Sequence, residues 1–234
     1  MIRFDDVTLS VPVPGPPGQP WGTKTLLDGI TLDLPERRVA LVGANGSGKS
    51  TLLRLINGLS TATAGRVEVD GIDPARDGKQ ARRRVGFVFT DPLSQLVMPT
   101  PLEDVELSLR AKIRDRTERR RAALGLLAAR GLAQVAEQSI YDLSGGERQL
   151  VALTAVLAVE PSVLVADEPT TLLDLRNRIA FRRLIAELPQ QMVIATHDLD
   201  LAADADRVLI VDQGRVVADG TASETLAHYE RMMV

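Results

Sequence analysis

The stretch Gly43–Thr51 (GANGSGKST) decides the fold of this chain, because the apolar run Val39–Val42 precedes it and a helix-like segment, Leu52–Leu59, follows it. This order predicts a strand, a glycine-rich loop and a helix. The three glycines let the backbone turn tightly, so that successive N–H groups and the positive end of the helix form an anion cradle. The stretch matches the pattern GxxxxGK(S/T) in the context that the pattern requires, which predicts a phosphate-binding loop.

Two side chains of this loop suit a nucleotide and its metal ion. Lys49 can reach the β- and γ-phosphates, and the Ser50 hydroxyl is placed to ligate a Mg²⁺ ion that bridges them. A glycine turn with an incidental lysine is the alternative, and the flanking strand and helix disfavour it. The residues predicted to surround the phosphates are Gly43, Asn45, Gly46, Ser47, Gly48, Lys49, Ser50 and Thr51.

The composition limits which classes of protein this chain can belong to. The 234 residues, 44% of them hydrophobic, suffice for one sizeable core and a smaller subdomain. The net charge of −3 gives no bulk attraction to nucleic acid or anionic lipid, and the absence of cysteine excludes disulfides and thiolate metal sites. We expect no membrane span, since apolar stretches such as Val151–Val159 fall short of about 20 residues, and no signal peptide.

The N-terminal part carries strand and loop signals. Ile2–Val11 alternates apolar and polar residues, which predicts an edge strand, and Pro12–Pro20, with five prolines, predicts an irregular loop. Trp21 follows, 28 residues before Lys49. Its ring either stacks on the adenine of a nucleotide or covers the core beside the proline loop, and the sequence leaves both open. Further strands are expected at Ile30–Leu34, Gly65–Gly71 and Val85–Phe89.

The sequence pattern changes from strand-like to helical between Thr90 and Tyr141. Prolines interrupt the chain first, and helical periodicity follows at Leu102–Ile113 and Thr117–Ala129. This pattern predicts a helical insert. The basic run Arg110–Arg121 is a candidate contact for lipid headgroups or a partner, but its interleaved acidic residues favour a solvent-facing helix surface.

Two later segments carry polar groups at strand ends. The segment Val163–Pro169 (VLVADEP) predicts a buried strand that ends in two acids, and burying two carboxylates there is energetically costly unless they bind something. A Mg²⁺ ion held by Asp167 and an attacking water oriented by Glu168 would account for both. His197 follows the strand Met192–Thr196 at the end where open α/β sheets bind ligands, so it is a candidate to contact the γ-phosphate. Solvated acids and an ordinary strand-end histidine are the alternatives.

Between these segments, Leu143–Gln149 (LSGGERQ) opens an apolar helix that continues through Val159. A serine and two glycines at a helix start leave backbone donors free for an anion, although in isolation they indicate only a capped helix. The C-terminal part predicts a helix to Leu188, strands at Arg207–Asp212 and Arg215–Ala218, and a helix at Ala222–Met232 with His228 on its surface.

Together these segments resemble the ATP-binding cassette (ABC) family. Five motifs stand in family order: GANGSGKST as Walker A, LSGGE as the signature, VLVADEP as Walker B, Thr171–Asp174 (TLLD) as the D-loop and His197 as the switch histidine. The resemblance implies an α/β P-loop NTPase cassette with a RecA-like core, an antiparallel β subdomain and an inserted α-helical subdomain. It implies one domain, with the core and β subdomain in residues 1–89 and 160–234, and the Q-loop region, helical subdomain and signature helix in residues 90–159.

The resemblance also implies how the residues act. Two cassettes face head to tail, and each ATP lies between the phosphate loop of one and the signature of the other, with ATP and Mg²⁺ as cofactors. The implied contacts to the partner's ATP are Ser144, Gly145, Gly146 and Asp174. The implied catalytic residues are Glu168, His197 and Lys49, and the implied metal ligands are Ser50 and Asp167. Glu147 stands where glutamine is commoner, which we interpret as a tolerated variation.

One position departs from the family pattern. Thr90 stands where members usually have the Q-loop glutamine, so either Thr90 reaches the Mg²⁺ through water or Gln95 takes over part of that role. The segment Thr90–Leu109 is similar to energy-coupling factor (ECF) and cobalt-type ATPases, and most to those of biotin uptake systems.

That similarity implies a peripheral ATPase on the cytoplasmic face of a membrane importer. A transmembrane T component would dock near residues 91–108 and a membrane S component would bind the substrate, which this chain would not touch. The chain would form a dimer, with a homodimer favoured, and would bind no nucleic acid.

Other ABC classes fit less well. A cobalt, nickel or other importer is the nearest alternative. DNA-repair members carry a long coiled coil between Walker A and the signature, but only about 95 residues separate Lys49 from Ser144. Translation-type members usually carry two cassettes in one chain, whereas this sequence has one. A scaffold that binds ATP without hydrolysing it would require that Glu168 take no part in catalysis.

Overall fold

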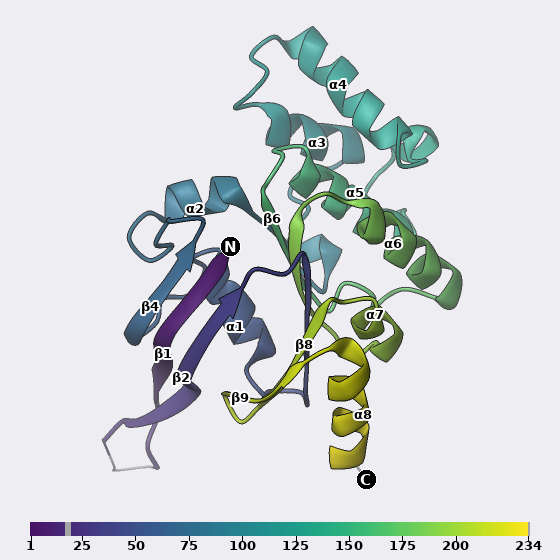
Figure 1. Ribbon diagram of the computed structural model, residues 1–234. Coiled ribbons are helices and arrows are strands. Elements are labelled where there is room, and N and C mark those ends of the chain that lie inside the picture. Colours follow the sequence, from purple (N-terminus) through teal and green to yellow (C-terminus); the bar gives the residue numbers. More distant parts are fainter. Residues whose placement is uncertain (17–19, 234) are drawn as a thin grey trace.

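The computed structural model describes residues 1–16 and 20–233, and its centre is a six-stranded sheet with the order β5-β6-β7-β3-β8-β9 (Figure 1). All neighbouring strands are parallel except β8 and β9. The carboxyl ends of β3, β6 and β7 therefore meet at one edge, where such sheets bind ligands. The strands are β3 (Arg38–Val42), β5 (Val85–Val88), β6 (Val163–Asp167), β7 (Gln191–Ala195), β8 (Arg207–Asp212) and β9 (Arg215–Gly220).

A second sheet is antiparallel and has the order β2-β1-β4. Its strands are β1 (Ile2–Val13), β2 (Gly22–Leu34) and β4 (Ala64–Val69). The prediction of an edge strand at Ile2–Val11 was wrong, because β1 lies between the other two. The alternation of apolar and polar residues reports one buried face, which central and edge strands share.

The proline-rich loop was also predicted too long at its start. Pro12 and Val13 belong to β1 and pair with β2, and β2 begins at Gly22 rather than Ile30. The pairing of β1 with β4 ends at Thr8, so Pro12 has a strand on one side only and its missing N–H is tolerated there. Residues 17–19 of the predicted loop lie outside the described residues.

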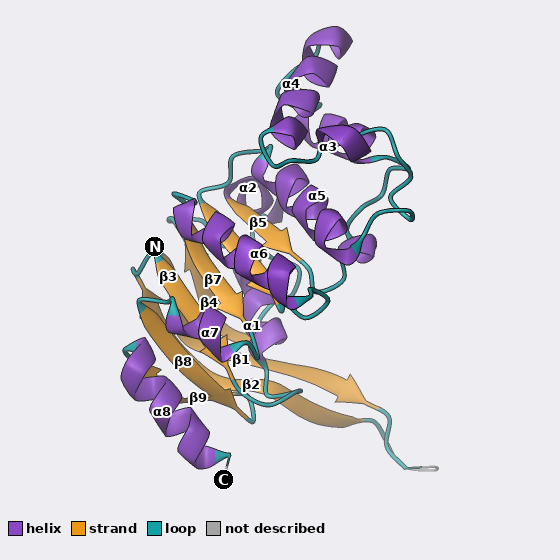
Figure 2. Cartoon of the chain, turned by 90° about the vertical axis from the view of Figure 1, so that its right-hand side faces the viewer, coloured by secondary structure: helices purple, strands orange, loops and turns teal. Residues whose placement is uncertain are grey.

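The helices of the core fill two layers. Helix α1 (Lys49–Ile56) lies between the two sheets, where its leucines share one cluster with Val39 and Leu41 of β3 and with Ile2 and Phe4 of β1. The opposite face of the large sheet is covered by α6 (Leu175–Glu187), α7 (Leu199–Ala203) and α8 (Ala222–Met232), as Figure 2 shows.

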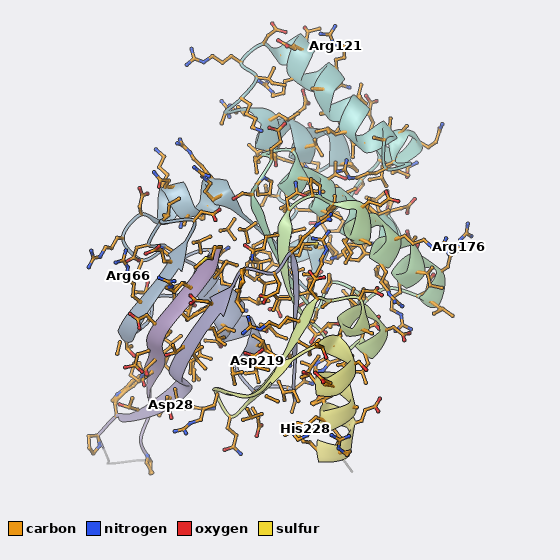
Figure 3. The ribbon with its side chains drawn as sticks, viewed as in Figure 1. Asp28, Arg66, Arg121, Arg176, Asp219 and His228 are labelled. Atoms are coloured by element: carbon orange, nitrogen blue, oxygen red, sulfur yellow. The ribbon has the colours of Figure 1, made fainter. Side chains whose placement is uncertain are left out.

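The segment between β5 and β6 is mainly helical and has its own core. It contains α3 (Pro101–Leu109), α4 (Arg116–Ala128) and α5 (Gly145–Leu157), with short 3₁₀ turns at Pro92–Ser94 and Ala133–Val135. The buried residues of this core all lie between Leu96 and Ala158. In the basic run, Arg121 projects outward from α4 (Figure 3), and Arg120 pairs with Glu137, as expected of a solvent-facing surface.

Two short helices were not predicted. Helix α2 (Gly78–Arg84) carries an exposed arginine triplet in its last turn, and α7 follows His197 closely. His228 is exposed on α8, as predicted (Figure 3). Among the described residues, none of the helices combines the length and hydropathy needed to cross a bilayer.

Candidate functional site

The loop from Gly43 to Gly48 connects β3 to α1 and depends on its glycines. Gly48 caps α1 in a left-handed conformation, with φ at 116°. A Cβ atom on Gly43 would lie 2.1 Å from the Val211 carbonyl oxygen, so only glycine fits against β8. The turn between β8 and β9 supports the loop as well, since Gly214 N donates to Ser47 O at 2.8 Å. That support was not predicted, because no local pattern links these two segments.

Polar groups of this loop point inward. The Lys49 side chain is buried and its Nζ donates to Gly43 O at 2.7 Å and to Ala44 O at 3.0 Å. Burial lowers the pKa of Lys49, whereas the charges of Glu168 and Asp167 raise it. Ser47 Oγ is buried and has no hydrogen-bond partner among the described residues. A buried hydroxyl without a partner, two residues before a buried lysine, suits an anionic ligand such as a phosphate.

A pair of oxygen ligands lies beside the loop. Ser50 Oγ donates to Asp167 Oδ1 at 2.8 Å, where the first turn of α1 meets the end of β6. Hydroxyl and carboxylate oxygens suit Mg²⁺, which commonly takes one or two protein ligands and completes its shell with phosphate and water. The described residues hold no cluster of three or more His, Cys, Asp or Glu that could bind a metal without such help. The donor set therefore fits Mg²⁺ bound together with a nucleotide.

Glu168 and His197 meet at the ends of β6 and β7. Glu168 Oε2 accepts from His197 N at 3.1 Å, and His197 Nε2 lies 2.8 Å from Asn45 Oδ1 and 3.1 Å from Glu168 Oε1. Burial raises the pKa of Glu168, although the His197 N–H and nearby positive charges oppose the shift. Glu168 Oε1 is buried and makes no aligned hydrogen bond among the described residues, and since His197 Nε2 lies 3.1 Å from it, a water bound to this oxygen would lie beside the His197 ring. A buried carboxylate of raised pKa suits a general base.

Thr90 and Gln95 occupy different places. Thr90 Oγ1 donates to the backbone carbonyl of Asp167 at 2.9 Å, so it contacts the strand that carries the candidate metal ligand. Gln95 bridges two backbones, since its Oε1 accepts from Phe89 N and its Nε2 donates to Ala152 O, each at 3.2 Å. Gln95 therefore ties the segment after β5 to α5.

The signature residues form a second group. Ser144 caps α5, and Gly146 packs against α6 so closely that a Cβ there would lie 2.6 Å from Asn177 Cγ. Asp174 caps α6 and accepts from Asn177 N at 2.8 Å. Ser144, Gly145, Gly146 and Asp174 thus share one region, whereas Asn45, Lys49, Ser50, Asp167, Glu168 and His197 share another.

Trp21 lies just before β2, at the end of the β1–β2 hairpin. Its side chain is 69% exposed, so the interpretation that it covers the core is wrong. Further along β2, Leu26 O and Leu27 lie against Gly48 of the loop. Leu26 lies five steps along the extended chain from Trp21, roughly 16 Å. Stacking on adenine stays a prediction.

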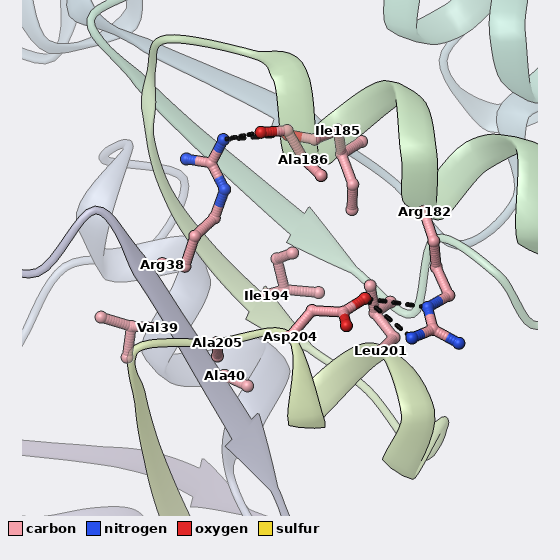
Figure 4. A pocket seen from close by; sticks show the side chains of 10 residues that line it. All are labelled: Arg38, Val39, Ala40, Arg182, Ile185, Ala186, Ile194, Leu201, Asp204 and Ala205. Atoms are coloured by element: carbon pink, nitrogen blue, oxygen red, sulfur yellow. Dashed lines mark hydrogen bonds and ion pairs between the residues drawn. The ribbon is translucent and has the colours of Figure 1, made fainter. Parts of the chain in front are cut away.

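A small cavity of about 40 Å³ lies elsewhere, between β3, α6 and α7 (Figure 4). The Arg38 guanidinium donates there to Ile185 O at 2.9 Å and to Leu188 O, at the end of α6. Arg182 pairs with Asp204 on the other side of the cavity at 2.9 Å. Since β3 begins at Arg38 and ends at the loop, this cavity lies at the opposite end of the sheet and belongs to the packing of α6.

Comparisons with known proteins agree with this geometry. The model of the ABC transporter family matches residues 27–171. The biotin transport ATP-binding protein BioM of Rhizobium etli is 41% identical over 215 residues, 92% of this chain and 96% of that protein. An energy-coupling factor transporter ATP-binding protein of Symbiobacterium thermophilum is 40% identical over 213 residues, 88% of this chain and 74% of that protein.

A solved structure is similar over nearly the whole chain. The dimeric post-hydrolysis state of the ATP-binding cassette MJ0796, bound to ADP and Pi, has a TM-score of 0.84 and 30% identity. The similarity covers 95% of this chain and 99% of that one. The α/β cassette with an antiparallel sheet and helical insert, predicted from the motifs, is therefore confirmed.

Proposed function

Because this chain belongs to the ABC transporter family, we propose that it is the ATP-hydrolysing subunit of a membrane importer of the energy-coupling factor type, with biotin as the favoured cargo. The observation that carries the proposal is the convergence of Lys49, Ser50, Asp167, Glu168 and His197 on one edge of the sheet. Biotin is favoured because BioM is similar over almost the full length of both chains.

Each residue of this edge has a chemical task in the proposal. Lys49 and the loop amides stabilise negative charge on the phosphoryl group that is transferred. Glu168 orients or deprotonates the attacking water, and His197 supports it through the contacts that hold its ring between Glu168 and Asn45. Ser50 and Asp167 would hold Mg²⁺, which neutralises charge on the phosphates when bound. The Thr90 bond to the Asp167 carbonyl supports a role for Thr90 in placing that ligand.

ATP would also join two copies of the chain. In this proposal Ser144, Gly145, Gly146 and Asp174 contact the ATP held by Lys49 of a second copy, and Trp21 stacks on the adenine. The dimeric state of MJ0796 bound to ADP and Pi supports this arrangement. A bound γ-phosphate gives the closed dimer contacts that the open one lacks, so hydrolysis would reset it.

A groove supports the proposed membrane partner. It has a volume of about 380 Å³ between β5, α3 and α5, with Phe89, Val97 and Leu107 among its apolar lining residues. Val97 is 69% exposed and Leu107 is 41% exposed, and exposed apolar side chains that gather in a groove mark interaction sites. An amphipathic helix of a transmembrane T component would fit there.

In the proposed complex the cargo stays outside this chain. A membrane S component would bind the vitamin, and this chain would sit on the cytoplasmic face as a peripheral subunit. Residues 90–159 would act as the partner-binding part, and residues 1–89 and 160–234 as the part that binds and hydrolyses ATP.

The test is uptake of labelled biotin by vesicles that contain this chain with its T and S components, with ATP supplied on the side of this chain. We expect uptake to require ATP and to fail with Glu168→Gln. Uptake of another vitamin or of a metal ion would replace biotin as cargo, and ATP-independent uptake would contradict the proposal.

The groove has a matched test of its own. Leu107→Glu should abolish co-purification with the T component, whereas Leu124→Glu, which alters an exposed leucine on α4, should not. Normal co-purification of the Leu107 variant would rule out the groove as the docking site.

A further inference from the structure

We propose, on the basis of the head-to-tail dimer proposed above, that Glu147 weakens the closing of the dimer on ATP. It does so by holding the hydroxyl proton of Ser144 and by placing a negative charge beside the position of the partner's phosphates. Glu147 is thus a residue that sets the ATP concentration at which the transporter closes.

Glu147 and Ser144 bind each other in both directions at the start of α5. Ser144 N donates to Glu147 Oε2 at 2.8 Å, the Ser144 hydroxyl donates to the same oxygen at 2.6 Å, and Glu147 N donates to Ser144 Oγ at 3.3 Å. These bonds to Ser144 lower the pKa of Glu147, so the side chain is ionised at neutral pH. An ionised carboxylate only accepts hydrogen bonds, so the single hydroxyl proton of Ser144 is committed to it.

The same hydroxyl lies where a ligand would meet it. Ser144 is exposed, whereas Gly146, two residues further along, is buried against Asn177. A phosphate oxygen also accepts hydrogen bonds, so it must compete with Glu147 for the proton of Ser144. The short bond to an ionised acceptor is of the strong kind, and the phosphate must approach a second anion to break it.

Glutamine at position 147 would weaken the competition for the Ser144 proton and would remove the negative charge that a phosphate must approach. Its amide oxygen can still accept from Ser144 N and preserve the cap, but a neutral acceptor holds the hydroxyl less strongly. Its amide nitrogen can in addition donate to a phosphate. Glu147→Gln therefore keeps the local fold and removes the competition.

The test measures the ATP concentration for half-maximal dimerisation by analytical ultracentrifugation, with Glu168→Gln present in every protein to stop hydrolysis. We expect Glu147→Gln to lower this concentration about tenfold, which corresponds to about 1.4 kcal/mol. High salt should narrow the difference, because it screens exposed charges. In a Ser144→Ala background the effect of Glu147→Gln should shrink, since part of it acts through that hydroxyl.

Helix α8 supplies a matched control. Thr221 and Glu224 form a similar side-chain pair at its start, with Thr221 Oγ1 donating to Glu224 Oε2 at 2.7 Å and Glu224 N donating to Thr221 Oγ1 at 3.5 Å. This helix lies far from α5 (Figure 1). Glu224→Gln removes the same charge from the same type of cap, and should leave dimerisation unchanged.

The outcomes separate the two proposals. An unchanged or higher ATP requirement for Glu147→Gln, or an equal effect of Glu224→Gln, would overturn the role of Glu147. ATP binding without dimerisation in every variant would instead contradict the head-to-tail dimer itself, and the role of Glu147 with it. Thermal unfolding of each variant, followed without ATP, would reveal any loss of fold.

Discussion

Ser50 Oγ and Asp167 Oδ1 lie 2.8 Å apart, although 117 positions separate the two residues in the sequence. The hydroxyl belongs to the first turn of α1 and the carboxylate to the last residue of β6. Each element alone offers one oxygen, and only the folded sheet brings the two oxygens together. The proposed Mg²⁺ site at this pair therefore depends on the packing of α1 against β6.

Removal of the hydroxyl should raise the Mg²⁺ requirement. Ser50→Ala leaves Asp167 as the single protein ligand of the pair, so we expect Mg²⁺ affinity to fall by at least the roughly 10- to 100-fold that loss of a supporting contact costs. ATPase rates titrated with Mg²⁺ measure this. Ser94→Ala, which alters a hydroxyl bonded to Asp91 O, is the control, and an unchanged Mg²⁺ dependence of Ser50→Ala would exclude Ser50 as a ligand.

Glu168→Gln should separate ATP binding from hydrolysis. The amide keeps the size of the carboxylate but cannot accept a proton, so turnover should fall by about 10²- to 10⁴-fold while ATP binding and dimerisation persist. Single-turnover hydrolysis of radiolabelled ATP measures the loss. Near wild-type turnover would remove Glu168 from the role of base, and Glu160→Gln, an exposed acid paired with Lys112, should have no effect.

Gly146→Ala should destabilise the chain. The new Cβ would lie 2.6 to 2.8 Å from three atoms at the end of the Asn177 side chain, so that side chain must rotate away, at a cost of about 0.5–1.5 kcal/mol. Urea unfolding measures the change, and Asn177→Ala in the same chain should recover part of it. Gly125→Ala on α4 meets open space and should instead stabilise by about 0.5–1 kcal/mol. Equal effects of the two substitutions would contradict the packing described for Gly146.

Asp104 should make stability depend on pH. Burial raises its pKa, against the opposing bonds from Met98 N and Val97 N, both of which reach Oδ2 at 2.9 and 2.8 Å. The folded state thus binds a proton more tightly than the unfolded state, whose Asp has a pKa of about 3.9. The stability that this proton contributes is full below that pKa and is lost as the pH rises through the raised value.

Asp104→Asn is the matched comparison for this pH effect, because an amide oxygen can accept both backbone bonds without a charge. Relative to this variant, the wild type should lose stability between acidic and neutral pH in urea unfolding. A parallel pH dependence of the two proteins would contradict the assignment.

The motifs predicted the site better than they predicted the sheets. The pattern around Lys49 and the acids at Asp167 and Glu168 are local signals whose geometry follows from a strand end and a glycine turn. The central position of β1 depends on its pairing with β4, more than 50 residues away, and no local pattern encodes a partner. The same reason explains why the contact of Gly214 with the loop was missed.

Side chains whose role depends on what packs against them in three dimensions were the hardest to predict. Trp21 is hydrophobic, yet it lies exposed at a hairpin end, because burial depends on what packs against it rather than on its type. Gln95 reads as a loop residue, but its amide fits between Phe89 N and Ala152 O, a pairing visible only in three dimensions. Glu147 stands three residues after Ser144, the spacing of a capping box, so their contact follows a local rule, whereas the bond from the Ser144 hydroxyl to Glu147 is visible only in the structure.

Helix α6 is fastened at both of its ends. The Asp174 carboxylate accepts a hydrogen bond from the backbone N–H of Asn177 in the first turn. At the other end of the helix, the Arg38 guanidinium donates to the backbone carbonyls of Ile185 and Leu188. Because both ends are held, we expect a displacement of the first turn to move all 13 residues of the helix as one rigid body. In the proposed dimer, a displacement of Asp174 at the subunit interface would then be transmitted by α6 to Arg38, at the end of the sheet opposite the phosphate-binding loop.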